Sequence, residues 1–224
     1  MGRYDRNGIF NKDEMDKIFS SHVCVIGSGG LGGYIQEMLA RVGVGKLTCV
    51  DGDVFDETNL NRQLFSTVDN VGKVKVWEAN KRLAVVNPDV AVKAIHKRME
   101  CDNVHELIGD ADLVVDALDN ISTRIILQDA CEELKIPLVH GAIAGWYGQV
   151  TTILPGDRTL SKIYKDAGDS GIETELGNPS FTPATIASIQ VSEALKVLAG
   201  KTDILQNKIL MVDLLDNEFQ VVKI

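Results

Sequence analysis

The sequence lacks an excess of positive charge. It holds 23 Lys and Arg residues against 32 Asp and Glu residues, a formal net charge of −9. The electric field of this negative net charge repels phosphate backbones and anionic lipid surfaces, so nucleic acids and membranes are poor candidates for partners. Any anion that this protein binds must therefore be held by a local arrangement of donors.

Long apolar runs and paired cysteines are also absent. No run approaches 18 consecutive apolar residues, and the first ten residues contain no apolar signal core, so the cytoplasm is the expected compartment. The four cysteines, Cys24, Cys49, Cys101 and Cys131, form no CxxC pair. We therefore expect neither a zinc site nor a disulfide framework.

Short β-branched runs do alternate with longer amphipathic ones, which is typical of a parallel sheet wrapped by helices. Apolar residues at helical spacing predict a helix that begins near Gly30 and ends at Gly43. The predicted strands are His22–Ile26, Leu47–Asp51, Val90–Ala94, Leu113–Asp116 and Leu138–His140, and further helices are predicted over Asn70–Val86 and Ser122–Leu134.

The pattern changes after Gly148. A strand over Gln149–Leu154 has no helix behind it, and a polar stretch follows over Pro155–Pro179. Thr182 and Pro183 offer a cap and a first residue to another helix, and a terminal hairpin is predicted over 208–213 and 219–224. The sequence thus predicts one Rossmann-like α/β domain over 1–224. It comprises an N-terminal arm (1–20), a parallel doubly wound half (21–148), and an antiparallel half (149–224) with a crossover loop (155–179).

A glycine-rich loop follows the first predicted strand. In Gly27-Ser-Gly29-Gly30-Leu31-Gly32, three glycines satisfy G-x-G-x-x-G, and missing Cβ atoms let a backbone approach a phosphate at a helix N-terminus. Asp51 ends the second predicted strand, where a carboxylate can accept both ribose hydroxyls. The alternative is a glycine turn used only for close packing. The whole unit is present, with a strand, the glycine loop, a helix, a second strand and an acidic residue in that order, and this favours a nucleotide-binding loop over a packing turn.

The residues after Asp51 argue against a nicotinamide dehydrogenase. The segment Asn59-Leu-Asn-Arg62-Gln63 places a guanidinium near the phosphates, and Lys75, with Asp69 or Asn70 as the predicted cap, stands in the first turns of the next predicted helix. Added cations suit a triphosphate whose charge migrates during a reaction. Taken singly, such residues are more often solvated surface charges, so their common position at the carboxyl edge of the sheet carries the argument.

Together these motifs resemble those of the E1-like adenylating enzymes of the ThiF/MoeB/HesA family, relatives of ubiquitin-activating enzyme. Segments near Gly148 and Gly200 also look like this family, so the resemblance covers nearly the whole chain. The matching motifs are Arg3-Tyr-Asp-Arg6, the Gly27–Gly32 loop, Asp51, Asn59-Leu-Asn-Arg62-Gln63, Lys75 and Asp116-Ala-Leu-Asp119-Asn120.

The resemblance implies ATP-dependent adenylation of the C-terminal glycine of a ubiquitin-like sulfur-carrier protein ending in Gly-Gly, as in thiamin or molybdopterin synthesis. It implies Mg²⁺ on Asp119 and a homodimer in which Arg6 reaches the neighbour's triphosphate. Asp51 would hold the ribose. The other residues that it implies for the ATP site are Gly27, Gly29, Gly30, Leu31, Gly32, Asn59, Arg62, Gln63, Lys75 and Asn120.

Several alternatives stay open from the sequence alone. The substrate could be a small-molecule carboxylate instead of a protein, whereas the net charge argues against a tRNA base as the substrate. The protein could also be a nicotinamide oxidoreductase or a non-catalytic scaffold. Asp116 or Asp119 could cap the helix that follows. For His140 a catalytic role is less favoured than a structural one. For Trp146 and Tyr147 core packing is favoured over contact with the carrier's tail. Because 157–179 contains no cysteine, we expect the reaction to stop at the acyl-adenylate.

Overall fold

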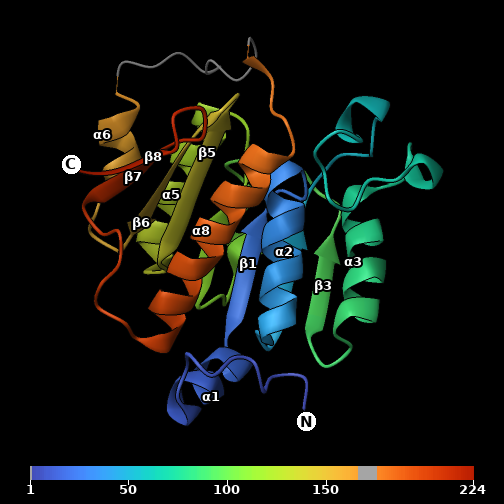
Figure 1. Cartoon of the computed structure of the whole chain (residues 1–224), viewed down its shortest axis with the longest axis horizontal. Coiled ribbons are helices and arrows are strands. Elements are labelled where there is room, and N and C mark those ends of the chain that lie inside the picture. Colours follow the sequence, from blue (N-terminus) through green and yellow to red (C-terminus); the bar gives the residue numbers. More distant parts are fainter. Residues whose placement is uncertain (1, 166–175) are drawn as a thin grey trace.

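The computed structural model describes residues 2–165 and 176–224 (Figure 1). Within them the chain forms one mixed sheet of eight strands, in the order β3-β2-β1-β4-β5-β6-β7-β8. The strands are β1 His22–Ile26, β2 Lys46–Val50, β3 Ala91–Ile95, β4 Leu113–Asp116, β5 Leu138–Ala144, β6 Tyr147–Ile153, β7 Lys208–Asp213 and β8 Glu218–Lys223.

The order of the strands confirms the predicted fold class. Strands β1 to β5 pair in parallel, whereas β5–β6, β6–β7 and β7–β8 are antiparallel. Helices are also found where an amphipathic pattern predicted them, and none of the helices in the described residues is long and apolar enough to cross a membrane. The helices are α1 Lys12–Ser20, α2 Gly30–Val42, α3 Lys75–Val86, α4 Val104–Ile108, α5 Ile121–Leu134, α6 Thr159–Ile163 and α8 Phe181–Ala199.

Helices cover both faces of the sheet, which explains why β1 and β4 are buried along their whole length. Alternate side chains of β1 enter different cores: Val23 and Val25 join the cluster under α2, α3 and α8, while Cys24 and Ile26 join the cluster under α4, α5 and α6. Figure 1 shows α2, α3 and α8 side by side on one face, and the N-terminal α1 beyond the amino ends of the parallel strands.

Two predicted helix boundaries are wrong. The helix predicted over Asn70–Val86 begins only at Lys75, and the residue before it is Val74, so neither Asp69 nor Asn70 caps it. Gly72, with φ of 84°, takes a left-handed conformation that a continuous helix excludes. A short 3-10 turn, η2, over Val68–Asn70 occupies the start of the predicted segment.

The helix near Pro183 also begins earlier than predicted. Thr182 lies inside α8, which begins at Phe181, and its hydroxyl donates to the Gly145 carbonyl oxygen at 2.6 Å instead of capping the helix. That bond ties the start of α8 to the β5–β6 turn. Part of the predicted polar stretch forms α6, whereas residues 166–175 of the predicted crossover loop lie outside the described residues.

Candidate active site

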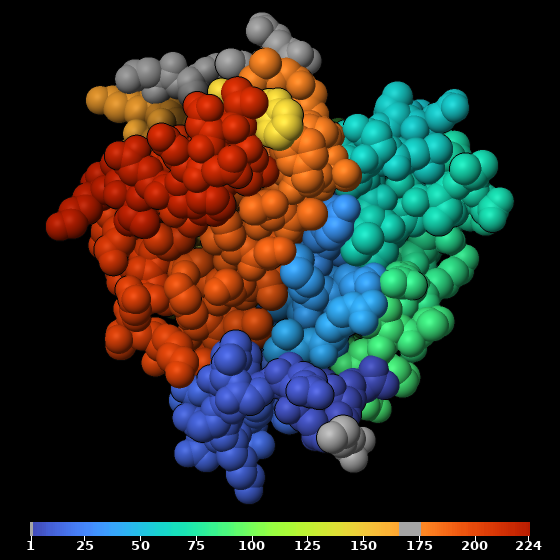
Figure 2. All heavy atoms as spheres, in the orientation of Figure 1, coloured from blue at the N-terminus to red at the C-terminus, as the bar shows by residue number. Residues whose placement is uncertain are grey.

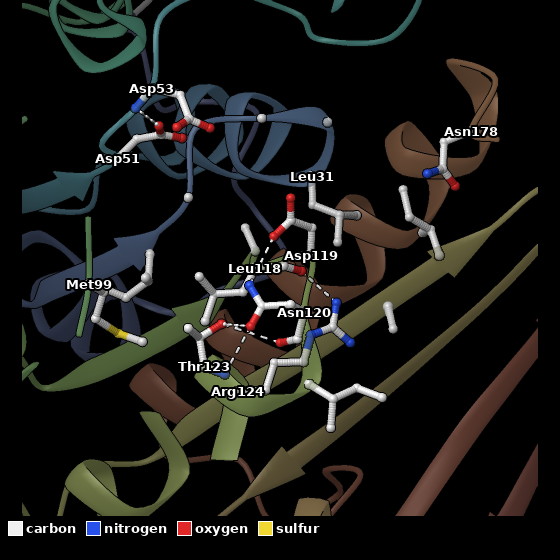
Figure 3. A pocket seen from close by; sticks show the side chains of 18 of the residues that line it. Leu31, Asp51, Asp53, Met99, Leu118, Asp119, Asn120, Thr123, Arg124 and Asn178 are labelled. Carbon is white, nitrogen blue, oxygen red and sulfur yellow. Dashed lines mark hydrogen bonds between the residues drawn. The ribbon is translucent and has the colours of Figure 1, made fainter. Parts of the chain in front are cut away.

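A cavity of about 480 Å³ lies at the carboxyl ends of β1, β2 and β4, the edge where ligands bind in open α/β sheets. We call the part lined by Gly27 and residues 29–31, 51–53 and 97–99 its glycine-loop end, and the part lined by 142–144, 147–149 and 211 its hairpin end. In Figure 3 the side chains of the β4–α5 segment lie between Asp51 and Met99 on one side and Asn178 on the other; those labelled are Leu118, Asp119, Asn120, Thr123 and Arg124.

The glycines of the loop serve two different purposes. Gly27 has φ of 106°, and a Cβ there would lie 2.5 Å from the Ala117 carbonyl oxygen; a Cβ on Gly32 would lie 2.0 Å from the Gly27 carbonyl oxygen. Packing alone requires glycine at both positions. Gly30 differs, because a Cβ there would make only ordinary contact with Pro183 at 3.6 Å. Since Gly30 lines the cavity at the start of α2, its lack of a side chain leaves room for a ligand.

Asp51 lies where β2 ends, at the glycine-loop end of the cavity. Its Oδ2 accepts a hydrogen bond from the Ser28 backbone N–H at 2.7 Å, and its Oδ1 accepts one from the Asp53 N–H at 2.8 Å. Burial raises the pKa of Asp51, against the opposing effect of the Lys75 charge and these two donors. The carboxylate therefore stays fixed beside the loop, in the orientation that its backbone donors set.

Two predicted cations line the same part of the cavity. The side chain of Lys75 is only 8% exposed, and its Nζ lies 3.4 Å from Asp53 Oδ2. Arg62 donates to the Thr58 carbonyl oxygen at 3.0 Å. Beside them, the side chain of Gln63 is buried, and its Oε1 accepts no hydrogen bond from any described residue. A buried acceptor without a partner is costly, so a ligand donor or a water fits at this point.

Sequence reasoning missed three charged residues of the glycine-loop end: Asp53, Lys97 and Arg98. Asp53 joins two cations, because its other oxygen, Oδ1, accepts from Arg98 at 3.0 Å. Lys97 and Arg98 could have been found from the sequence, since they follow β3 at the carboxyl edge of the sheet, where the glycine loop also lies. Among the described residues the cavity is thus lined by five cations and three carboxylates, a local excess of positive charge within a chain of net charge −9.

The loop between β4 and α5 separates the roles of its two acids. Asn120 caps α5, since its Oδ1 accepts from the Thr123 N–H at 3.0 Å, so neither Asp116 nor Asp119 is the cap. Asp119 is exposed and lines the cavity, together with Asn120. Asp116 is wholly buried behind the loop, where its Oδ1 accepts from the Leu118 N–H at 2.8 Å. Of the two acids, Asp119 is thus the one that a ligand can reach.

Asp116 belongs to a buried polar cluster under the cavity. Its Oδ2 lies 2.6 Å from Nδ1 of His140 and 3.8 Å from Nε of Arg124. Burial raises the pKa of Asp116, but the Arg124 charge and the His140 hydrogen bond bring it below its usual value. Burial lowers the pKa of His140, which is wholly enclosed. His140 does not line the cavity, so its contacts within this cluster are structural.

The hairpin end of the cavity is apolar. Tyr147, Gln149 and Met211 line it together with residues 142–144. The interpretation of Trp146 and Tyr147 as core residues is wrong, because each is 44% exposed. The tight β5–β6 turn, with Gly145 at φ of 57°, turns these rings outward, and the Trp146 ring packs on Phe181 with centroids 4.6 Å apart. Figure 2 shows the yellow atoms of this turn at the surface between the C-terminal hairpin and the start of α8.

Three predicted site residues lie outside this cavity. Gly32 is part of the packing of the loop, and Asn59 is buried, with its Oδ1 accepting from the Asp56 N–H at 3.0 Å. Arg6 is exposed in the N-terminal arm, which is tied to the carboxyl end of α2 by Asn7, whose Nδ2 donates to the Val42 carbonyl oxygen at 3.1 Å. That arm lies at the amino edge of the sheet, across the molecule from the cavity (Figure 1).

The acidic side chains of the cavity could hold a divalent cation only together with oxygens of a ligand. No group of three or more His, Cys, Asp or Glu side chains in the described residues is arranged to hold a metal ion by itself. Mg²⁺ is usually bound by one or two carboxylates plus substrate phosphates. Asp119, with a single exposed carboxylate opposite the glycine loop, has the chemistry for that shared arrangement.

Comparisons with known proteins agree with this geometry. The SAMP-activating enzyme E1 of Haloferax volcanii is 37% identical, over 99% of this chain and 84% of its own length. The sulfur carrier protein ThiS adenylyltransferase of Bacillus subtilis is also 37% identical, over 89% of this chain and 62% of its own length. A crystal structure of Escherichia coli MccB shares the fold, with a TM-score of 0.86, 20% identity and coverage of 99% of this chain and 69% of its own.

The family model covers almost all of the chain. It is described as the ThiF family, and it matches residues 4–224, which include the glycine loop, Asp51, Lys75 and Asp119. The match extends through the hairpin end of the cavity to the last strand. The chain therefore belongs to the ThiF family.

Proposed function

We propose that this protein uses ATP to adenylate the C-terminal glycine carboxylate of a ubiquitin-like sulfur-carrier protein, with release of pyrophosphate. One observation carries the proposal: a single cavity joins a cation-rich glycine-loop end to an apolar hairpin end that reaches the surface. A relative with 37% identity is itself a sulfur carrier protein adenylyltransferase. The activity is that of an ATP-dependent nucleotidyltransferase.

In this reaction a carboxylate oxygen of the carrier bonds to the α-phosphorus of ATP, while the bond from that phosphorus to the oxygen of pyrophosphate breaks. One anion must therefore approach another, so the protein has to align the groups and neutralise charge. Asp51 would accept hydrogen bonds from the ribose hydroxyls. Gly27, Gly29 and Gly30 would let the loop backbone approach the phosphates, with Leu31 beside them at the start of α2.

Arg62, Lys75 and Gln63 would contact the phosphates, because all three line the cavity beside the glycine loop. The Nζ of Lys75 lies 3.4 Å from Asp53 Oδ2, and a triphosphate can outcompete this ion pair. Asp119, next to Asn120, would hold Mg²⁺, which supplies further neutralisation of the phosphate charge when it is bound. Asn59 would act indirectly, by keeping the turn before Arg62 in place.

The hairpin end favours a protein tail over a small-molecule carboxylate. Tyr147 and Met211 line it and are exposed, and beside Tyr147 the exposed ring of Trp146 packs on that of Phe181. Exposed apolar surface of this kind marks protein interaction sites, whereas a small acid needs an enclosed pocket with polar groups that fix it. A tail that ends in Gly-Gly is narrow enough to run over the paired residues 142–144 and 147–149, which line the cavity, toward the glycine loop.

Arg6 would reach a triphosphate only in a second subunit. Its own arm is held at the far edge of the sheet, so a homodimer must bring the neighbour's arm to the cavity. The test mixes two inactive variants, Arg6→Ala and Lys75→Met, after dissociation and reassociation. We expect the mixture to regain part of the wild-type activity, since a hybrid dimer has one complete site. A mixture that stays inactive contradicts the homodimer with shared sites.

Thiolation would be left to another protein. Cys131 is buried, and burial raises its pKa well above that of a free thiol, so it is a poor nucleophile. Cys101 is exposed but does not line the cavity. Mass spectrometry of the enzyme after reaction with ATP and carrier should show no covalent adduct. A thioester on Cys101 would contradict this part of the proposal.

The decisive test is ATP–pyrophosphate exchange, with and without candidate ubiquitin-like carriers that end in Gly-Gly. We expect exchange only when a carrier is present and its terminal glycine is intact. A carrier that lacks the last glycine is the matched control, because its folded surface is unchanged. Exchange with a small acid instead would favour a small-molecule substrate, and the absence of ATP binding in calorimetry would overturn the proposal.

A further inference from the structure

Tyr164 occupies a position that neither the sequence motifs nor the proposed chemistry explains. It directly follows α6, and it lines the cavity. Its hydroxyl oxygen lies 2.7 Å from Gln149 Nε2, 3.2 Å from Arg124 Nη1 and 3.2 Å from His140 Nε2. These partners come from β6, α5 and β5, so one phenol oxygen joins three elements as well as its own.

The hydrogen-bond directions at this hydroxyl follow from its neighbours. Asp116 is ionised, since its pKa lies below the usual value, so the Nδ1–H of His140 donates to it. Burial lowers the pKa of His140 and so favours the neutral ring; with Nδ1–H directed at Asp116, its Nε2 is then the acceptor for the Tyr164 proton. The two lone pairs of the phenol then accept from Arg124 and Gln149. Every donor and acceptor site of the hydroxyl is used.

Arg124 connects the hydrogen bonds of the Tyr164 hydroxyl to the cavity. Its guanidinium donates to the Leu118 carbonyl oxygen as well as to Tyr164, and it lines the cavity between the two ends (Figure 3). Leu118 belongs to the loop that presents Asp119, whereas Gln149 belongs to the hairpin end. The hydrogen-bonded series Leu118–Arg124–Tyr164–Gln149 therefore links the β4–α5 loop, which lies between the two ends of the cavity, to the strand of the hairpin end.

Helix α6, which Tyr164 directly follows, is fastened to α5 by hydrogen bonds. Leu160 is wholly buried, its backbone N–H donates to Gln128 Oε1 at 2.7 Å, and Gln128 Nε2 donates to the Ser161 hydroxyl at 2.9 Å. Both ends of the Gln128 amide thus fasten α6 to α5, the helix that carries Arg124. The phenol of Tyr164 and the guanidinium of Arg124 are held to the same helix, and their relative position is set before any ligand arrives.

We propose that Tyr164 is a positioning residue for the transfer step, which holds the guanidinium of Arg124 where the two ends of the cavity meet. The inference rests on the proposed function, because a cation at this junction is useful when a carboxylate from one end meets a phosphate from the other. Preorganised cations at such a point stabilise the transition state more than the bound substrates. Loss of Tyr164 should therefore slow turnover and leave ATP affinity unchanged.

The test is a double-mutant cycle with Tyr164→Phe and Arg124→Lys, measured as carrier-dependent ATP–pyrophosphate exchange. Loss of hydrogen bonds to a charged group is worth roughly a tenfold change, so we expect Tyr164→Phe to lower kcat about tenfold with an unchanged ATP affinity in calorimetry. In the Arg124→Lys background the same change should have little further effect, since the group that it positions is already gone.

Thr151→Val is the matched control. It also removes a buried hydroxyl, which donates to the Lys208 carbonyl oxygen at 2.7 Å, but Thr151 does not line the cavity. We expect this variant to lose thermal stability and keep kcat. Independent, additive effects of Tyr164→Phe and Arg124→Lys would overturn the inference, as would an unchanged kcat. A wild-type protein without carrier-dependent exchange would instead overturn the proposed function, and the wild-type measurement alone distinguishes the two failures.

Discussion

The two ends of the cavity are built in different ways. The glycine-loop end consists of residues just beyond the ends of parallel strands, such as Gly27 after β1, Asp51 after β2 and Lys97 shortly after β3. The hairpin end takes residues from an antiparallel turn and from β7, more than sixty positions later along the chain. Parallel strands end at one edge by their topology, whereas the hairpin end exists only because β6 pairs with β7.

The chemistry of the two ends differs in the same way. Cations gather at the glycine-loop end, where Lys75 and Arg98 share Asp53. Apolar side chains such as Met211 and Tyr147 line the hairpin end, and the Tyr164 hydroxyl joins Gln149 of that end to Arg124, which lies between the two ends. One end is therefore suited to a charged nucleotide, and the other to a flexible peptide, which suggests experiments that disable each end separately.

The largest expected effect is at Lys75. Lys75→Met keeps the length of the side chain and removes the charge, so carrier-dependent exchange should fall about a hundredfold or more, as for other preorganised donors to a transition state. Lys73→Met is the control, because Lys73 is exposed and does not line the cavity. Unchanged exchange in Lys75→Met would break the assignment of the glycine-loop end to phosphates.

A pair of glycine substitutions should separate ligand space from packing. In Gly30→Ala the new methyl group meets only Pro183 and Arg62 at ordinary distances, so we expect normal stability and about tenfold weaker ATP binding in calorimetry. In Gly32→Ala the Cβ would lie 2.0 Å from the Gly27 carbonyl oxygen, so the melting temperature should fall. The reverse result would mean that Gly30 is needed for the fold instead of the ligand.

Met211→Asp should affect the hairpin end alone. Met211 is exposed and lines the cavity, so a carboxylate there should raise the KM for the carrier severalfold by placing a charge against the peptide. ATP affinity should not change. Val85→Asp, on the far side of α3 and 81% exposed, is the matched control. An equal loss in both variants would contradict a specific carrier surface at this end.

The smallest effect on activity is expected at Glu37, which lies outside the cavity. Its carboxylate accepts from Arg82 and Arg41 and joins α2 to α3. The Arg82 hydrogen bond in particular lowers its pKa below the ordinary 4.5, so its contribution to the free energy of unfolding is present above that value. Protonation removes the contribution as the pH falls through the folded-state pKa.

Glu37→Gln should therefore reduce the free energy of unfolding by about 1–2 kcal/mol at neutral pH and leave exchange unchanged. In urea titrations the wild-type advantage should shrink as the pH falls from about 4.5, and it should vanish below the folded-state pKa of Glu37, where both proteins carry a neutral side chain. Ser20→Ala, which removes an exposed hydroxyl, is the control. A constant difference at every pH would show that Glu37 contributes through packing instead of charge.

Much of the glycine-loop end could be predicted because its signals are local. The period of the apolar residues locates β1, α2 and β2, and the polarity of parallel strands then brings Gly27, Asp51 and Asp119 together without any knowledge of packing. The boundary of α3 was missed because Gly72 acts through its backbone conformation, which a helical pattern of side chains does not reveal. Lys97 and Arg98 follow the same rule as Asp51 and could have been included.

By itself the sequence determined the parallel βαβ core, the glycine loop and the charges at its edge, since short-range periodicity and strand polarity are enough to place them. Only the tertiary structure decided that Tyr164 meets Arg124 and Gln149, that Trp146 is exposed, and that Arg6 lies far from the cavity of its own chain. These facts depend on contacts between segments distant in sequence, which packing selects and no local pattern encodes.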